Sequence, residues 1–529
     1  MAVNRFTGAI NANTGTAGNW SLGTVPTAVD GHVTTFDATS PNFTTNTPLS
    51  CNALDFTGYS NTGTMTNNVF SYGNTTLWPT MNISGTGGLA IMTSATFTTN
   101  GYQWPNRFAL GGNAQSYIFA DAVTLLNDFA AVGGWLGGGG FNPTITLNGN
   151  LIIKGNYTGS GVQTYNGAYT IYLEGDFTMP GNCNIAGTTP WIWNGTTNKT
   201  FSCINSTNLP NITINGTGTV TFINNFVTGR NTFTILSPCN TSDCNLIIGT
   251  GATTSIIDTP VQYAGIWKSV TIAVAGPFTV QLNSPLYTSN PILGSSSQQL
   301  TLNGSPVYVF NGRLQSGPGN GGQILGTSQI IAIGDKFTYL DSATSVFQGQ
   351  GVWRIPITVN AGYFLMMGRF VLSTGGSLTI NSNKVDSKAI FRNLPELIVQ
   401  ASTTLTNIDK CKFKNVTITA GITITMNKFF TGSPEFKTVI RSTIATTNYN
   451  IIFTDTIPKK AFFVNIRNCT VNQTLVKNQL NIIGRDANAG FNTGILFGDN
   501  GREGFPLNQF PTEPSYSFGN GFQVGGMNN

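Results

Sequence analysis

Two carboxylates give this chain its strongest candidate for chemistry. Glu174 and Asp176 lie two residues apart at the end of an apolar and aromatic stretch that begins at Tyr169. On an extended strand, residues two apart share one face, and a rise of about 3.3 Å per residue separates them by roughly 7 Å. Cleavage of a glycosidic bond requires two carboxylates held at a defined separation. The pair therefore predicts contact with a glycan.

Two tryptophans follow these carboxylates. Trp191 and Trp193 are also two residues apart, so a strand can display both on one face as a flat platform for sugar rings. Together the four residues form a predicted glycan-binding group. The competing interpretation is structural, because Glu-x-Asp is common on solvated strand faces and paired tryptophans often fill a core or an interface.

The sequence offers few residues for other kinds of catalytic site. The single histidine, His32, is near the N-terminus, so no second imidazole can complete a zinc cluster, and a catalytic triad would depend on this residue alone. Gly137 to Gly140 form a glycine run, but no Gly-Lys-Ser/Thr follows it. We expect a protein without enzymatic activity, with no catalytic residue, no metal and no cofactor.

The elements that would position these residues are strands of an internal repeat. A short motif, polar and apolar residues in alternation followed by a turn, occurs six times, tens of residues apart. Its copies are Asn82-Ile83-Ser84-Gly85, Thr146-Leu147-Asn148-Gly149, Thr213-Ile214-Asn215-Gly216, Thr301-Leu302-Asn303-Gly304, Thr379-Ile380-Asn381-Ser382 and Thr417-Ile418-Thr419-Ala420. We predict that the apolar residue of each copy points into one continuous core.

Composition indicates an all-β chain. Only 9% of the 529 residues are charged, while 63 are glycine and 35 are phenylalanine. Helix-favouring residues are scarce, and short runs rich in Thr, Ile, Val and Phe recur between turn residues. Barrels and sandwiches are also all-β, but a motif that returns over more than 300 residues favours a parallel β-helix, or β-solenoid, with ladders of asparagine at its turns.

The first 60 residues differ from the repeats, and we assign 1–60 to an N-terminal cap and 61–483 to the solenoid. The opening contains Asn19-Trp20-Ser21, Val25-Pro26, Phe36-Asp37-Ala38 and Leu54 to Tyr59. This order resembles the start of β-helical tail and fibre proteins of tailed bacteriophages, and of related bacterial adhesins. We expect Trp20 and Phe36 to cover the open end of the core.

The segment 484–529 loses the strand rhythm and is assigned to an irregular C-terminal arm. Its aromatic residues are separated by Gly, Pro and Asn, so the arm cannot form a core of its own. One interpretation is a frayed terminus; the other is an arm that docks on a partner through aromatic anchors. The predicted docking residues in this arm are Phe505, Phe510, Tyr516 and Phe518.

Positive charge gathers in one block of the chain. Residues 351–480 contain 15 lysines and arginines against 5 carboxylates, a net charge of +10. Within it, strand alternation would place Lys410, Lys412 and Lys414 on one face, with Cys411 and Phe413 on the other. Outward lysines commonly protect an exposed edge; the alternative is docking to an acidic partner. Nucleic acid is not expected, because the aromatic residues here alternate inward and are not displayed with the lysines for base stacking.

The cysteines and the N-terminus bear on location. Seven cysteines without a C-x-x-C motif indicate buried thiols, although Cys239 and Cys244 are close enough to close a small loop. No apolar leader follows Met1, and no apolar run is long enough to span a membrane. We therefore expect synthesis and assembly in the host cytoplasm rather than export or membrane insertion.

These observations favour a structural role. We expect a virion component, a tail, fibre or capsid-attached protein, whose solenoid is a stiff spacer and whose partners are other virion proteins. The resemblance also implies a homo-oligomer, most simply a trimer. The alternative is a tailspike-like protein that binds or cleaves a host surface glycan through a groove along the solenoid.

Overall fold

The structure is a computed structural model that divides into two units, Met1–Gly312 with Gly326–Ser328, and Arg313–Leu325 with Gln329–Asn529. It describes residues 2–132, 142–179, 184–203, 211–228, 232–236, 239–248, 254–258, 267–272, 278–289, 291–293, 299–311, 313–316, 323–333, 336–340, 352–359, 363–367, 369–381, 384–386, 396–432, 438–454, 459–471, 480–483, 492 and 495–498.

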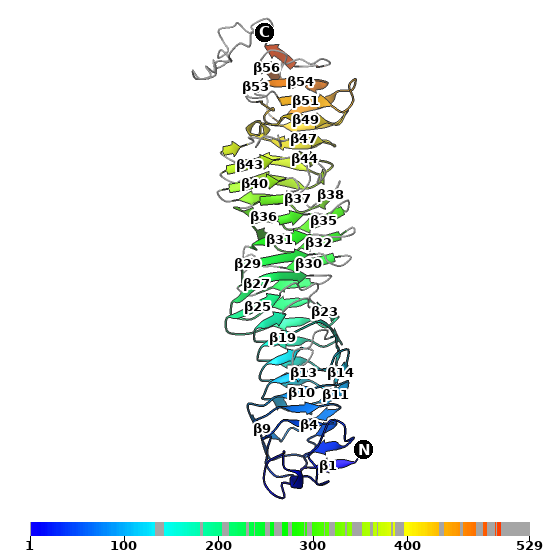
Figure 1. Cartoon of the computed structure of the whole chain (residues 1–529). Coiled ribbons are helices and arrows are strands. Elements are labelled where there is room, and N and C mark those ends of the chain that lie inside the picture. Colours follow the sequence, from blue (N-terminus) through cyan, green and yellow to red (C-terminus); the bar gives the residue numbers. More distant parts are fainter. Residues whose placement is uncertain are drawn as a thin grey trace, which may run out of the picture. The chain divides into compact units, whose positions relative to one another are not determined.

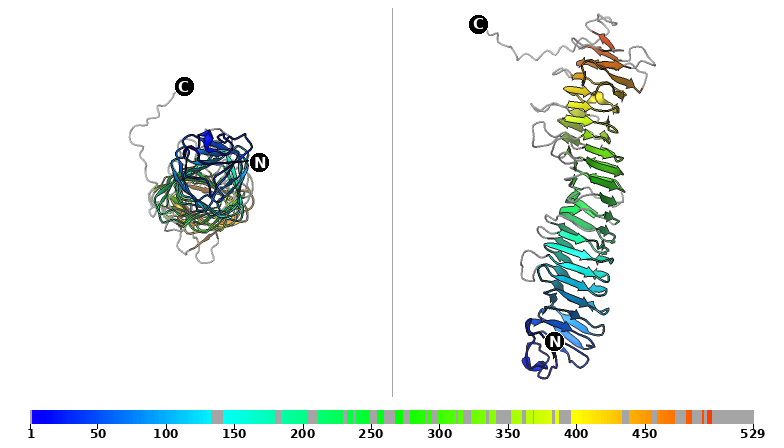
Figure 2. Two further views of the ribbon diagram at one scale, coloured as in Figure 1. Left: turned by 90° about the horizontal axis from the view of Figure 1, so that it is seen from below. Right: turned by 90° about the vertical axis from the view of Figure 1, so that its right-hand side faces the viewer.

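Parallel strands account for nearly all of the described chain, so the predicted β-solenoid is confirmed. Every strand pair recorded within the two units is parallel, and strands adjacent in a sheet are, with two exceptions, two or three strands apart in the sequence. Figure 1 shows the strands of each unit stacked as rungs, and Figure 2 shows the same stacking from two other directions. The described residues contain no α-helix, only the 3₁₀ turns η1 (Ala17–Asn19) and η2 (Ile408–Lys410).

The first unit contains three long sheets and two short ones. The first sheet runs β1 (Val3–Arg5), β2 (Val33–Thr35), β5 (Ala53–Asp55), β8 (Thr75–Thr76), β11 (Ala95–Thr98), β14 (Ser116–Phe119), β17 (Thr144–Leu147), β20 (Val162–Asn166), β23 (Asn184–Gly187). The second runs β4 (Leu49–Cys51), β7 (Val69–Ser71), β10 (Leu89–Ile91), β13 (Phe108–Leu110), β16 (Phe129–Ala131), β19 (Tyr157–Gly159), β22 (Phe177–Met179), β25 (Lys199–Cys203), β27 (Val220–Thr228), β29 (Cys239–Ile248), β31 (Ser269–Ile272), β34 (Pro291–Leu293).

The third long sheet of this unit runs β12 (Gln103–Trp104), β15 (Val123–Leu125), β18 (Leu151–Ile153), β21 (Ile171–Leu173), β24 (Trp191–Trp193), β26 (Ile212–Ile214), β28 (Thr232–Ile235), β30 (Thr254–Asp258), β32 (Phe278–Leu282), β35 (Gln299–Gly304). The short sheets are β3 (Phe43–Thr44), β6 (Thr62–Met65), β9 (Asn82–Gly85), and β33 (Leu286–Thr288) with β36 (Val307–Phe310).

The second unit continues the same architecture. One sheet is β37 (Arg313–Ser316), β40 (Lys336–Leu340), β43 (Tyr363–Met367), β46 (Lys384–Asp386); the next is β38 (Gln323–Gly326), β41 (Val352–Trp353), β44 (Arg369–Leu372), β47 (Glu396–Val399), β49 (Asn415–Ile418), β51 (Thr438–Ser442), β54 (Val464–Ile466). The others are β39 (Ile330–Ile333), β42 (Pro356–Val359), β45 (Ser377–Ile380), β48 (Thr403–Thr406), β50 (Thr423–Met426), β52 (Tyr449–Phe453), β55 (Cys469–Val471), and β53 (Lys459–Phe462), β56 (Leu480–Ile483), β57 (Ile495–Gly498).

The core contains the predicted positions of the repeat motif. All six apolar residues are at most 4% exposed: Ile83, Leu147, Ile214, Leu302, Ile380 and Ile418. Burying each such side chain contributes about 1.5–3 kcal/mol. The prediction that these residues point inward is therefore confirmed.

Aromatic side chains form a column through the core of the first unit. Six residues pair in register on consecutive turns, with neighbouring ring centroids 5.2–5.8 Å apart. The column is Phe108, Phe129, Tyr157, Phe177, Phe201 and Phe222. Stacked and edge-to-face contacts of this kind add to area burial and hold the turns in one register.

Glycine ends several copies of the repeat motif because the chain passes close to the preceding turn. Gly85 and Gly304 have φ angles of +101° and +94°. An added Cβ would lie 2.3 Å from the carbonyl oxygen of Met65 or Leu282. No other residue fits both constraints without moving the main chain.

Aromatic residues close the N-terminal end, as predicted. Trp20 and Phe36 are 3% and 1% exposed, and both contact Phe6, at centroid distances of 5.2 and 5.4 Å. Within the first 60 residues, β2, β4 and β5 already pair in parallel with later strands.

Candidate functional site

The predicted carboxylate pair lies at a corner of the solenoid. Glu174 follows β21 and Asp176 precedes β22, and Gly175 turns the chain between them. Both side chains are half-buried. They do not share a strand face, since the strand ends at Leu173.

Asp176 has a structural partner. Its Oδ1 accepts a hydrogen bond from the backbone N–H of Thr200 at 2.8 Å, and its own N–H donates to Asn156 Oδ1 at 2.9 Å. One turn earlier, Asn156 N–H donates to Asp128 Oδ1 at 2.8 Å. These residues form a ladder in which each side chain caps the next turn, as the abundance of asparagine predicted.

The prediction that the two tryptophans form an exposed platform for sugar rings is wrong. Trp191 and Trp193 share one face of β24, as predicted, but that face is the core, and they are 3% and 1% exposed. Trp191 packs edge-on against Tyr157 at 4.9 Å, and Trp193 Nε1 donates to the Gly175 carbonyl at 3.1 Å. The residue between them, Ile192, faces outward. Neither indole face is available to a sugar.

The lysine segment is not a strand. Lys410 ends η2, and 411–414 is irregular. The alternation still holds, because Cys411 and Phe413 are fully buried. Lys412 is fixed, donating from Nζ to the Asp409 carbonyl at 3.1 Å and to Thr431 Oγ1, and burial lowers the pKa of its ammonium group.

Of the three lysines, only Lys414 is exposed, and Lys410 and Lys412 are half-buried, so the set does not form one outward row. The arm residues Phe505, Phe510, Tyr516 and Phe518 lie outside the described residues.

The cysteines behave as buried thiols. Five are buried, namely Cys51, Cys203, Cys244, Cys411 and Cys469. No disulfide joins Cys239 to Cys244, so the small loop that their spacing allowed is not closed. Cys183 lies outside the described residues.

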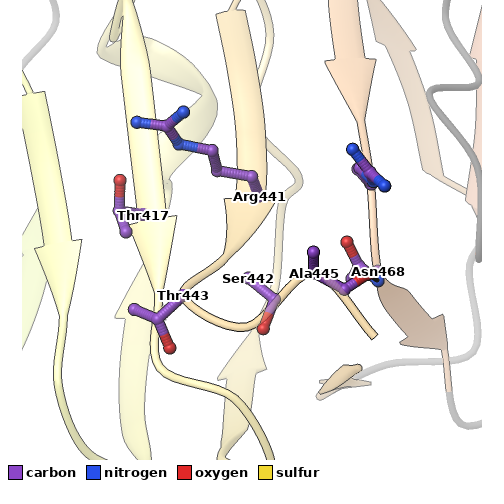
Figure 3. A pocket seen from close by; sticks show the side chains of 7 residues that line it. Thr417, Arg441, Ser442, Thr443, Ala445 and Asn468 are labelled. Carbon is purple, nitrogen blue, oxygen red and sulfur yellow. Dashed lines mark hydrogen bonds between the residues drawn. The ribbon is translucent and has the colours of Figure 1, made fainter. Parts of the chain in front are cut away.

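A pocket that the motifs did not reveal lies in the second unit. Its volume is about 370 Å³, and its lining comes from β49, β51 and the turns that follow β51 and β54. Figure 3 shows the Arg441 and Thr417 side chains on adjacent strands, with Ser442, Thr443, Ala445 and Asn468 around them. Arg467 completes the lining. We call these seven residues the arginine pocket.

Two arginines on consecutive turns define this pocket. Arg441 directly follows Ile440, and Arg467 directly follows Ile466, which pairs in register with Ile440. Arg467 N–H donates to the Ile440 carbonyl at 2.9 Å and so continues the parallel pairing. The sequence contained a signal for this pocket, because the dipeptide Ile-Arg occurs at Arg441 and again at Arg467, one turn of the solenoid later.

A second hollow, of about 380 Å³, lies in the first unit over β5 and β8. Its polar side chains already serve the fold. Asp55 Oδ1 accepts the N–H and the hydroxyl of Thr57, at 2.9 and 2.6 Å, and Asn74 Oδ1 accepts the N–H of Thr96 at 2.9 Å.

Comparison with known proteins adds no relative: no protein-family model, no curated protein and no solved structure matches the chain. Over the described residues, no group of three metal-ligating side chains occurs. The part of the chain that the structure describes also has no helix with the length and hydrophobicity to cross a bilayer.

Proposed function

We propose that the chain is a non-enzymatic structural component of a virion, a tail, fibre or capsid-attached protein in which the solenoid is a stiff spacer or attachment element. The observation that carries this proposal is the parallel stacking of successive turns within each unit. Parallel pairing, the aromatic column and the side-chain ladder at the corners all link one turn to the next. Bending such a stack requires many hydrogen bonds to lengthen together.

The surface and the closed end support the same role. Outward strand positions carry threonine, for example Thr146, Thr158 and Thr178. The hydroxyl group of threonine forms hydrogen bonds with water and carries no charge. The aromatic cap built on Phe6, Trp20 and Phe36 protects the core at the N-terminal end. The likeness of this opening to phage tail and fibre proteins is what directs the proposal to a virion.

Purified particles give the direct test. Antibody raised against the recombinant chain is expected to label intact particles at one place by electron microscopy, and mass spectrometry is expected to find the chain in particles banded on a density gradient. Recovery of the chain only from the soluble lysate, with unlabelled particles, would refute the virion role.

The oligomeric state is a separate part of the proposal. We expect a homotrimer, with the arm 484–529 needed for its assembly. Sedimentation equilibrium should give three times the chain mass of 56.2 kDa for the full chain and one chain mass for a variant that ends at residue 483. A monodisperse full-length monomer would contradict this.

A further inference from the structure

The arginine pocket places two positive charges close together in a chain with few charged residues. Charged residues are 9% of the sequence, yet Arg441 and Arg467 occupy neighbouring positions on consecutive turns. Adjacent parallel strands lie about 4.8 Å apart, and like charges placed opposite each other are destabilising. Arg441 is exposed and forms no ion pair or hydrogen bond recorded among the described residues. An anion bound between the two arginines would offset the repulsion expected of like charges at neighbouring positions.

The hydroxyl groups of the pocket are arranged to donate. Thr443 Oγ1 already accepts the N–H of Ala420 at 3.1 Å, and Ser442 Oγ accepts the N–H of Ile444 at 3.3 Å. Each hydroxyl therefore keeps its own hydrogen for another acceptor. Together with the two guanidinium groups, these hydroxyls make the pocket rich in donors, which suits a carboxylate or a similar oxyanion.

One acceptor in the pocket lacks a partner. Asn468 is 1% exposed and has a left-handed backbone, with φ of +59°. Its Nδ2 donates to the Ala445 carbonyl at 2.7 Å, which fixes the amide orientation, whereas its Oδ1 has no hydrogen-bond partner. A buried acceptor left unpaired costs about 1–3 kcal/mol. A ligand hydroxyl that reached this oxygen, after a shift of a neighbouring side chain, would recover that cost.

We propose that the arginine pocket binds an acidic sugar residue. Its carboxylate would lie between Arg441 and Arg467 and accept from the hydroxyls of Ser442 and Thr443, and a ring hydroxyl would donate to Asn468 Oδ1. The block 351–480, with its net charge of +10, would attract an anionic polysaccharide to this unit. This inference goes beyond the structural role and does not depend on the virion assignment.

Calorimetric titration of the full chain at low ionic strength tests the proposal with three probes. The first is a trimer of galacturonic acid, the second is its uncharged methyl ester, and the third is inorganic sulfate. We expect the acidic trimer to bind at least about tenfold more tightly than either of the others, since only it offers both an anion and hydroxyls. Equal affinity for the methyl ester, or sulfate binding as tight as that of the acidic sugar, would overturn the proposal.

Variants locate the site. Arg441→Gln leaves a shorter polar side chain and removes the charge, so we expect about a tenfold or greater loss of affinity for the acidic trimer. Lys428→Gln is the matched control, because Lys428 is exposed in the same unit and does not line the pocket. An equal loss in both variants would show only a general charge effect, and an unchanged Arg441→Gln affinity would place the sugar elsewhere; either result refutes the site.

Asn468→Gly tests the hydroxyl contact. Glycine accepts the left-handed backbone and removes the amide. We expect affinity for the acidic trimer to fall several-fold while affinity for sulfate is unchanged, with the thermal midpoint recorded to confirm folding. If both affinities are unchanged in the folded variant, Asn468 makes no ligand contact and the proposed sugar recognition is refuted.

Discussion

Asp176 Oδ1 accepts a hydrogen bond at 2.8 Å from the backbone N–H of Thr200, which belongs to the next turn of the solenoid. A carboxylate that sequence spacing assigned to sugar chemistry thus has a structural role at a corner. Its oxygen caps an N–H group that the ladder between strands does not satisfy.

Replacement of Asp176 should separate charge from hydrogen bonding. Asp176→Ala removes the acceptor and should lower the free energy of unfolding by about 0.5–1.5 kcal/mol. Asp176→Asn keeps an acceptor oxygen and should cost less. Urea unfolding followed by circular dichroism measures both, and equal losses in the two variants would contradict the capping role.

The aromatic column should be the most sensitive part of the first unit. Phe177 is 1% exposed and lies between Tyr157 and Phe201, at centroid distances of 5.3 and 5.2 Å. Phe177→Ala opens a cavity and should cost about 3–5 kcal/mol. Its neighbour Thr178 faces outward, so Thr178→Ala should change stability by less than about 0.5 kcal/mol. Similar thermal midpoints for the two variants would show that the column does not dominate packing.

Substitution of two glycines by alanine should separate the cost of backbone strain from the cost of a steric clash. Gly85 and Gly101 both have positive φ, +101° and +82°, but only Gly85 lies against the preceding turn. Gly101→Ala should cost about 1–2 kcal/mol from strain alone. Gly85→Ala should cost more, because its Cβ would displace the Met65 carbonyl. A Gly101→Ala variant with the lower thermal midpoint would reverse this assignment.

Alkaline conditions should destabilise the first unit. Burial raises the pKa of the Tyr117 phenol, ordinarily 10, and of the Cys51 thiol, ordinarily 9, each to about 12. Because the folded state keeps these protons longer than the unfolded state, their contribution is complete below the ordinary pKa values. It is lost as the pH rises through 9 and 10 toward about 12.

The urea concentration at the unfolding midpoint should therefore decrease as the pH is raised from about 8 to about 11. Tyr117→Phe should lower the midpoint at the lower pH, since the Gly112 N–H loses its acceptor at 2.9 Å. The same variant should show a shallower fall toward the higher pH. A slope identical to that of the parent chain would exclude Tyr117 as a contributor.

Polysaccharide cleavage is not expected. Host surface polysaccharide incubated with the purified chain should release no oligosaccharide, and Glu174→Gln should leave particle infectivity unchanged. Chromatography of the incubated polysaccharide is the measurement. Oligosaccharide release that disappears in Glu174→Gln would replace the structural role with the tailspike-like alternative.

Local sequence determined the solenoid and its core positions. The repeat motif carries its own alternation and turn residues, so the inward direction of Ile83, Leu302 and Ile418 followed from the sequence, as did the aromatic cover of Trp20 and Phe36. Period-two alternation also predicted correctly that Trp191 and Trp193 share a face. It did not predict which face points into the core, because the alternation alone does not say which side of the strand the neighbouring turns bury.

Contacts between turns were decided only by the tertiary structure. Lys412 binds Thr431, and Asp176 binds Thr200, across 19 and 24 residues of sequence. The arginine pocket likewise joins residues from 417 to 468, because successive turns bring Arg441 and Arg467 to neighbouring positions. Such pairs depend on the exact length of each turn, which varies: Leu89 pairs with Phe108 after 19 residues, and Phe129 with Tyr157 after 28. Turn length is set by loops, and the alternation of polar and apolar residues does not constrain loop length. The repeat motif therefore determined where the strands lie, whereas the stacking of turns determined which residues come together at the corner ladder and in the arginine pocket.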